Sequence, residues 1–439
     1  MRAGVSEGII NPLFPSLLYG YPLPKDRYHT TIHDDLMVHC FYFQNNDAEL
    51  GIITLDLCAM SKKRCRDLRE AVEKASGIPR NNIAVCCTHT HSGPVTTSID
   101  PRWNDDYEEY SDYVDSVVRI AVKKIAEAKE TSFEAMISAG KGICGAKQGV
   151  GGNRRDKDGP ADPEVFCLGI HDSTGTLRGA IVNYALHPTF LHAESREISA
   201  DYPAYIYNYF KSKSPDIIVG FTIGAAGNQS SRHFRTSQSF DEARRAGETI
   251  AAEASRVLAT SPRLTEPMLT VSSFDFTPPL TEIPTLAAAT ADEAEARRAY
   301  EEARDAGEAY PYVRTLECTL IGAEHRLNFA RSGPDNKAVA AWASPFEAQI
   351  MGFGDVHLVF WPGEHFVEYA LQLKQESPYP LTVLSTCANG AACGYICTPE
   401  AHAEGGYESL WTRYRPETGA RLVDATLKTL EGLRKGEDR

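Results

Sequence analysis

Residues 50–90 read LGIITLDLCAMSKKRCRDLREAVEKASGIPRNNIAVCCTHT, and this stretch indicates the fold class. Residues 50–57 and 82–90 are short runs rich in β-branched and apolar side chains, which is typical of buried strands. Between them, residues 61–77 carry apolar side chains at helical spacing and end on Gly77, a common residue just past a helix. A strand, a helix and a second strand in this order predict a β-α-β unit.

The same mixture of elements continues through the chain. We expect a helix at 105–129, a strand at 133–140, a hairpin at 167–188 with its turn at Asp172–Gly175, strands at 315–330, 346–363 and 380–387, and a final helix at 421–435. Because helices and strands alternate, the sequence predicts an α/β protein with a layered, mixed β-sheet core covered by helices.

The 439 residues contain no internal repeat, low-complexity tract or Pro-rich linker. We therefore expect a single catalytic domain over residues 1–439, with a possible helical insertion at 284–340. Residues 284–307 are rich in Ala and Glu, and their interleaved charges favour a solvated pair of surface helices over a catalytic role.

The composition excludes several classes of partner and location. The net charge is -14, from 45 Lys and Arg against 59 Asp and Glu, so the overall field repels nucleic acid and anionic lipid. No apolar run approaches the ~20 residues that span a bilayer, and the N-terminal residues lack the apolar core of a secretion signal. The 11 cysteines are an odd number without paired zinc-ribbon spacing, which favours reduced thiols. We expect a cytoplasmic protein without stable membrane association or a nucleic-acid partner, and its oligomeric state stays open.

The segment Thr88–Pro94, THTHSGP, contains two histidines at the end of the second predicted strand. Side chains at i and i+2 of an extended segment lie on one face, so His89 and His91 can converge on one point. Such a pair binds a metal in some proteins and is a hydrogen-bonded structural pair in others.

Three further segments end a strand in an abrupt turn. His187 stands before Pro188, Glu364 follows Pro362-Gly363, and GAAGNQSSRHF at 224–234 follows an apolar run. Imidazole nitrogens with a carboxylate oxygen suit a catalytic zinc that keeps one position open for water. His89, His187 and Glu364 would supply such a set, although His187 alone could be a core histidine and Glu364 alone a helix cap.

Blocks along nearly the whole chain resemble the neutral, non-lysosomal ceramidase family. The blocks are HDDL (33–36), LDL (55–57), THTHSGP (88–94), GNRR (152–155), NYALHPT (183–189), SADYP (199–203), GAAGNQSS (224–231), PGE (362–364) and GYICTPEAHAEGGYE (394–408). They occur in the family's order. The resemblance implies the ceramidase catalytic-domain fold, here in a short soluble form without the family's C-terminal immunoglobulin-like domain.

The resemblance also implies site residues. It adds Tyr395 to His89, His187 and Glu364 as a fourth ligand of a single Zn2+. It implies a substrate-facing set of His91, Arg154 and Tyr407, with Arg155 beside Arg154 as the alternative, and it aligns Ser230 with a serine that has been assigned as a nucleophile. The expected activity is a zinc-dependent hydrolase that cleaves an amide bond of its substrate with metal-activated water.

Two departures bear on the substrate. Asn228 and Ser231 stand where the ceramidases carry Asp and Pro around the family serine. Without an apolar surface tract for lipid, we expect a small, soluble N-acyl substrate in place of membrane ceramide. The same site could instead cleave an ester or lactone, and two His with one carboxylate also match the facial triad of non-haem iron oxygenases. A binding protein that has lost catalysis is the remaining alternative.

Overall fold

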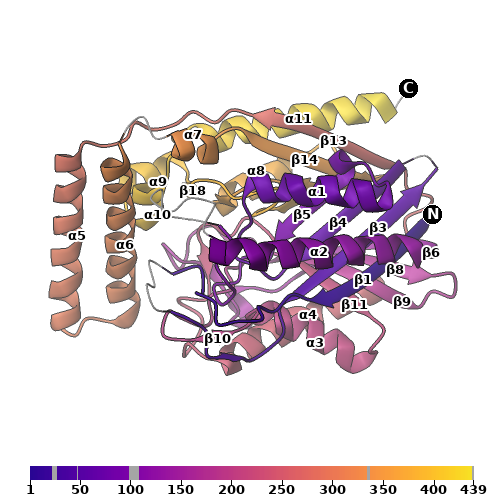
Figure 1. Ribbon diagram of the computed structural model, residues 1–439, viewed down its shortest axis with the longest axis horizontal. Helices are drawn as coiled ribbons and strands as arrows, with labels where there is room; N and C mark the ends of the chain where they lie inside the picture. The colour runs from indigo at the N-terminus through magenta and orange to yellow at the C-terminus, as the bar shows by residue number, and fades with distance from the viewer. Residues whose placement is uncertain (22–26, 47, 98–107, 334–336, 438–439) are drawn as a thin grey trace.

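The computed structural model describes residues 1–21, 27–46, 48–97, 108–333 and 337–437, and these form four layers (Figure 1). Two β-sheets lie face to face, and helices cover the outer face of each. The predicted α/β class with a layered, mixed core is confirmed. The sequence did not predict the number of sheets, and the described residues form two large sheets and three short strand pairs.

The larger sheet has eight strands in the order β11-β9-β8-β6-β1-β3-β4-β5. Their bounds are β1 Arg2–Ile9, β3 Met37–Asn45, β4 Ala48–Leu55, β5 Ile83–Cys87, β6 Phe133–Ile143, β8 Glu164–Asp172, β9 Leu177–Tyr184 and β11 Ile218–Ile223. The sheet curls, so that β11 at one edge comes close to β3, β4 and β5. This curl brings the ends of β5 and β9 toward one another although they are far apart in strand order.

The smaller sheet has four strands in the order β13-β14-β15-β17. They are β13 Leu269–Phe276, β14 Phe346–Phe353, β15 Val356–Phe360 and β17 Leu381–Ser385. The facing sides of the two sheets share one apolar core, in which Phe43 and Phe353 meet edge to face with ring centroids 4.9 Å apart. The short pairs are β2 Thr31–Ile32 with β10 Glu197–Ile198, β7 Gly152–Asn153 with β12 Gln229–Ser230, and β16 Glu364–His365 with β18 Tyr395–Ile396.

Helices α1 to α4 cover the larger sheet, and α8 and α11 cover the smaller one. The helix bounds are α1 Lys62–Ser76, α2 Glu108–Glu130, α3 Tyr202–Lys213, α4 Phe240–Thr260, α5 Leu286–Asp305, α6 Tyr310–Ser332, α7 Lys337–Ala343, α8 Val367–Glu376, α9 Pro399–Glu404, α10 Tyr407–Trp411 and α11 Thr418–Glu437, with 3-10 turns at Arg80–Asn82 and Ala146–Gln148. No helix in the described residues is long and apolar enough to cross a membrane.

The predicted β-α-β unit is β4-α1-β5, with β4 and β5 paired in parallel. The Ser61 side chain accepts a hydrogen bond from the backbone N–H of Arg64 at 3.2 Å and so caps the start of α1. Gly77 ends the helix in the left-handed conformation, at φ 77°, which glycine adopts without steric cost. The predicted hairpin is β8-β9, with its turn closed by a hydrogen bond from Gly175 N–H to the Asp172 carbonyl.

The strand predicted at 315–330 is wrong, because these residues lie within α6. The buried side chains Arg314, Cys318, Ile321 and His325 recur every three or four residues, which is the period of a helix. The apolar and β-branched content suggested a strand, but the burial pattern follows the helical period. α5 and α6 form a hairpin at one end of the molecule (Figure 1).

The division of the chain into one catalytic domain with an insertion at 284–340 stays a prediction, and residues 334–336 lie outside the described residues. Within it, α6 packs against α10, and a Cβ added at Gly322 would lie 2.7 Å from the Tyr407 carbonyl oxygen. Glycine therefore permits this close approach. All 11 cysteines are free, and ten of them are buried.

His357 in β15 is a buried imidazole whose two nitrogens have no hydrogen-bond partner within the described structure. It stacks on Tyr379 with ring centroids 3.6 Å apart. The guanidinium carbon of Arg434 lies over the Tyr379 ring, 5.3 Å from its centroid. Burial, with the charge of Arg434, lowers the pKa of His357 to about 4. The folded state therefore requires a neutral imidazole.

We predict that His357→Phe flattens the acid dependence of stability. Because the folded-state pKa lies below the unfolded value of about 6.5, wild-type stability is lost as pH falls from 6.5 toward 4. The wild type should lose up to about 1.4 kcal/mol per pH unit more than the variant in this window. Urea unfolding at pH 7 and pH 5 measures the difference, and identical pH dependence in both proteins would contradict a buried neutral His357.

Candidate metal centre and adjoining pockets

Three side chains from separate strand ends meet in the interior. His89 follows β5, His187 follows β9, and Glu364 begins β16 just after β15. One ligand atom from each lies within 4.8 Å of the others. His89 Nε2 is 3.2 Å from Glu364 Oε2, and His187 Nε2 is 2.9 Å from the same oxygen.

The other ring nitrogen of each histidine bonds to a backbone carbonyl. His89 Nδ1 is 2.9 Å from the Cys58 oxygen, and His187 Nδ1 is 2.6 Å from the Ala226 oxygen. A carbonyl only accepts, so each Nδ1 carries a proton and each Nε2 is the nitrogen that can bind a metal. This arrangement orients and fixes the tautomer of metal-binding histidines.

The two Nε2 atoms and the carboxylate oxygen can therefore all serve as ligands of one cation. Burial lowers the pKa of His89, but the neighbouring Cys387, Cys58 and Glu364 outweigh it and hold this pKa well above its usual value, so without a metal a proton lies between His89 and Glu364. Burial opposes ionisation of Glu364, but the neighbouring His89 and His187 outweigh it and hold the pKa of the carboxyl well below its usual value. Burial and the charge of Arg154 lower the pKa of His187 to about 4. Zinc binds neutral imidazole and ionised carboxylate, so it would displace the proton on His89, and the types of donor atom fit the expected ion.

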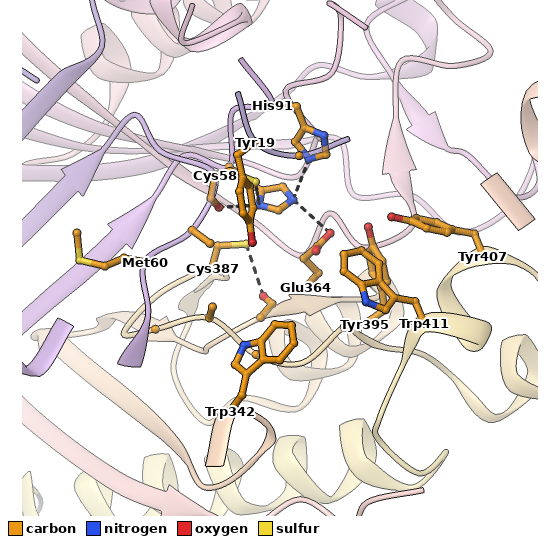
Figure 2. Close-up of a pocket in the computed structure, with 18 residues that line it drawn as sticks. Tyr19, Cys58, Met60, His91, Trp342, Glu364, Cys387, Tyr395, Tyr407 and Trp411 are labelled. Carbon is orange, nitrogen blue, oxygen red and sulfur yellow. Dashed lines mark hydrogen bonds and ion pairs between the residues drawn. The ribbon is translucent and has the colours of Figure 1, made fainter. Parts of the chain in front are cut away.

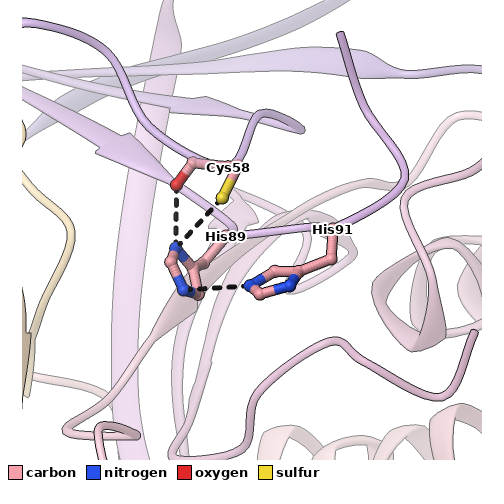
Figure 3. Close-up of side chains that lie close together, drawn as sticks. All are labelled: Cys58, His89 and His91. Carbon is pink, nitrogen blue, oxygen red and sulfur yellow. Dashed lines mark hydrogen bonds between the residues drawn. The ribbon is translucent and has the colours of Figure 1, made fainter. Parts of the chain in front are cut away.

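A second group of possible ligands consists of Cys58, His89 and His91 (Figure 3). The Cys58 sulfur lies 3.6 Å from His89 Nδ1, the nitrogen already bonded to a carbonyl. The sulfur thus approaches the ring nitrogen that is already occupied, while His89 Nε2 faces Glu364 and His187. The His89, His187 and Glu364 group is therefore the better candidate.

Tyr395 lies next to Glu364 because β16 and β18 pair in parallel with these two residues opposite each other. Figure 2 shows Tyr395, Tyr407 and Trp411 together on one side of the Glu364 carboxylate. Burial and the charge of Glu364 raise the pKa of both the Tyr395 and the Tyr407 phenol. Tyr395 therefore lies where the fourth zinc ligand implied by the resemblance would have to lie, and its role as a ligand stays a prediction.

His91 does converge on the same point as His89, with their Nε2 atoms 3.3 Å apart. Gly20 lies against the His91 ring at φ 94°, and a Cβ there would come within 2.3 Å of it. Tyr21 meets the ring edge to face at 5.1 Å. These contacts hold His91 beside the cluster while its Nδ1 has no described partner.

Of the two neighbouring arginines, Arg154 lines a pocket beside the cluster. Its Nε donates to Glu408 Oε1 at 2.9 Å, and its Nη2 is buried without a described partner. Arg155 points to the other oxygen of Glu408, at 2.8 Å, and to Glu404. Glu408 thus holds both guanidinium groups, and that of Arg154 also lies against Tyr395, with its carbon 5.3 Å from the ring centre.

The segment Gly224–Ser231 supports several of these residues. Besides the Ala226 carbonyl at His187, the Gly227 N–H donates to the His365 carbonyl at 2.8 Å, where a Cβ would leave no room. The Asn228 carbonyl accepts from Arg154 N–H, and its side chain bonds to Glu368 Oε2 and to the backbone N–H of Val367. The small residues of this segment let its backbone pack directly against the backbone of β16.

Ser230 lies in the same pocket as Arg154. Its Oγ accepts from the backbone N–H of Arg232 at 3.2 Å, and no described His, Asp or Glu bonds to it. A serine nucleophile needs such a base. The role of Ser230 stays a prediction.

Two pockets adjoin the cluster and share a wall of His91, Tyr395 and Tyr407. The first, here named the apolar pocket, is lined by His89 and Glu364 together with Met60 and Trp342 (Figure 2). The second, here named the arginine pocket, contains four arginines: Arg154, Arg232, Arg235 and Arg314. Sequence reasoning missed Met60, Trp342 and the last three arginines.

We predict that His187→Ala weakens zinc binding by more than about 100-fold, because even loss of an outer hydrogen bond to a ligand typically costs 10 to 100-fold. Cys58→Ser should keep nearly the wild-type affinity, because Cys58 contributes only its backbone carbonyl. Zinc content after dialysis against graded chelator measures both. Loss of zinc in Cys58→Ser with retention in His187→Ala would favour the other ligand group.

Comparison with known proteins supports the fold. A crystal structure of neutral ceramidase from Pseudomonas aeruginosa is similar with a TM-score of 0.78 and 19% identity, covering 99% of this chain and 74% of that chain. A structure described as ceramidase complexed with C2 is similar with a TM-score of 0.77 and 18% identity, covering 99% and 75%. No family model matches the sequence, and no curated protein matches it. The resemblance expected from the sequence is therefore confirmed at the level of the fold: nearly the whole chain folds like neutral ceramidase.

Proposed function

We propose that this protein is a zinc-dependent hydrolase that cleaves an amide bond of a small N-acyl substrate. The observation that carries the proposal is the group of three buried ligand atoms, His89 Nε2, His187 Nε2 and Glu364 Oε2, which lie around a common point. The ceramidase fold supports it, since the solved structures of this fold are described as ceramidases.

Zinc bound there, with Tyr395 as a further ligand, would lower the pKa of water to about 7 and polarise a carbonyl. The remaining requirements of amide cleavage belong to the protein. One is hydrogen-bond donors for the carbonyl oxygen as negative charge develops on it, and the other is a proton for the leaving amine.

The shared wall of the two pockets offers such groups. Arg154 Nη2 is a buried donor without a described partner, and its guanidinium carbon lies 5.7 Å from the centre of the Tyr407 ring. The raised pKa keeps the Tyr407 phenol protonated and able to donate. We assign Arg154 and Tyr407 to the carbonyl oxygen and His91 to proton transfer toward the leaving nitrogen.

His91 suits this role by position. Its Nε2 faces the metal cluster, and its ring borders both pockets, so it can reach a substrate that spans them. Gly20 and Tyr21 restrict the ring to this orientation. Ser230 is not required in this scheme, because the water supplies the nucleophile.

We predict that His91→Ala and Tyr407→Phe lower kcat for an N-acyl amide by about 100-fold or more, which is the range of general acid catalysis. On the p-nitrophenyl ester of the same acyl group the loss should be much smaller, because that leaving group departs without a proton. Ser230→Ala should keep most activity on both substrates.

Tyr209→Phe, on α3 away from the pockets, is the matched control and should change neither rate. All rates are measured on zinc-loaded protein and again after chelation and zinc readdition. Equal losses on amide and ester would contradict the amidase assignment. Activity that persists without zinc would contradict the proposed function as a whole.

A further inference from the structure

The arginine pocket gathers four arginines in a chain whose net charge is -14. It adjoins the metal cluster through His91, Tyr395 and Tyr407, so a substrate at the cluster can extend into it. None of the lining residues that the structure describes is acidic. The positive charge therefore comes from placement of the arginines, since the composition is acidic.

Two of these arginines have no carboxylate within ion-pair distance among the described residues. Arg232 donates only to neutral groups, the Arg154 carbonyl at 3.4 Å, Thr315 Oγ1 at 3.3 Å and the Cys318 sulfur at 3.3 Å. Arg235 donates to the Thr189 carbonyl and to Ser231 Oγ. Both guanidinium groups keep their charge at every accessible pH.

The other two arginines are only partly paired. Arg314 forms an ion pair with Glu317 at 2.6 Å. Arg154 is 6% exposed and shares the Glu408 carboxylate with Arg155. Its Nη2 makes no hydrogen bond within the described residues. The buried Nε2 of His192, in the same pocket, makes none either.

Partly buried cations without counter-charges are costly, and an anion that enters the pocket would offset this cost. Guanidinium groups bind carboxylate, sulfonate and phosphate through paired, charge-assisted hydrogen bonds. A neutral occupant would leave Arg232 and Arg235 without a counter-charge.

We propose that the arginine pocket binds an oxyanion carried by the substrate, while an apolar group of the substrate lies in the apolar pocket. The substrate class is an anionic N-acyl compound, such as an N-acyl amino acid, with the scissile bond at the shared wall. The inference rests on the proposed function and specifies its substrate.

The kinetic test compares matched substrates. N-hexanoylglycine is set against neutral N-hexanoylglycinamide, with N-hexanoyltaurine and N-hexanoylphosphoethanolamine to separate carboxylate from sulfonate and phosphate. A second pair, N-glutarylbutylamine and N-pentanoylbutylamine, tests whether the pocket binds an anion on the acyl part of the substrate. In at least one pair kcat/KM should favour the anionic member by about tenfold or more, the range of charge-assisted hydrogen bonds.

Arg232→Gln should reduce this preference to near unity, mainly through KM, and Arg232→Lys should restore part of it. Arg119→Gln, an exposed arginine of α2, removes the same charge elsewhere and should leave the preference unchanged. Arg235→Gln serves if Arg232→Gln does not fold. Equal turnover of charged and neutral substrates, or a preference that survives in both pocket variants, would overturn the inference.

A binding measurement separates this inference from the proposed function. N-hexanoylglycine and inorganic phosphate are titrated calorimetrically into zinc-loaded and zinc-free protein. Binding without zinc that is lost in Arg232→Gln and kept in Arg119→Gln would support the pocket even if no amide is cleaved. Absence of binding to zinc-free protein, or binding unchanged by Arg232→Gln and Arg235→Gln, would overturn it.

Discussion

The convergence of two imidazoles on one buried carboxylate is the constraint on which the site depends. His89 and His187 each donate from Nδ1 to a backbone carbonyl, so both turn Nε2 toward the carboxylate of Glu364. A buried carboxylate is unfavourable in a low-dielectric interior unless positive charge compensates it, and the raised pKa of His89 shows that a proton supplies this charge when no metal is bound. A divalent metal would replace that proton, and the backbone carbonyls would hold the ligands in place.

The fold supplies those carbonyls from segments far apart in sequence. Curling of the larger sheet brings the ends of β5 and β9 together, and the Gly224–Ser231 segment packs against both His187 and the β16 backbone. The β16-β18 pair sets Tyr395 beside Glu364, while α6 allows Tyr407 to approach through Gly322. The wall of His91, Tyr395 and Tyr407 then divides the surroundings of the cluster into an apolar and a positively charged side.

Much of the fold and part of the site could be predicted because their signals are local. The β4-α1-β5 unit, the β8-β9 hairpin and the strand-ending positions of His89, His187 and Glu364 follow from periodicity and turn residues. Tyr395 came only from the resemblance, since nothing in its neighbours marks a phenol as a ligand. The strand predicted at 315–330 failed because apolar and β-branched residues there follow the helical period of α6.

The arginine pocket could not be predicted, because Arg154, Arg232 and Arg314 are brought together only by tertiary packing. No spacing in the sequence relates them, and the acidic composition points away from an anion site. Only the partners in the folded chain distinguish Arg232 and Arg235 from ordinary surface arginines.

Zinc-edge X-ray absorption spectroscopy of the purified protein would identify the atoms that bind the metal. We expect near-stoichiometric zinc bound only by nitrogen and oxygen at ~2.0 to 2.2 Å, with the multiple-scattering signature of imidazole rings. A sulfur ligand at ~2.3 Å would instead show that a cysteine of the apolar pocket, Cys58 or Cys387, binds the metal. Purified, correctly folded protein that binds no zinc when the metal is supplied would contradict the proposed metal centre.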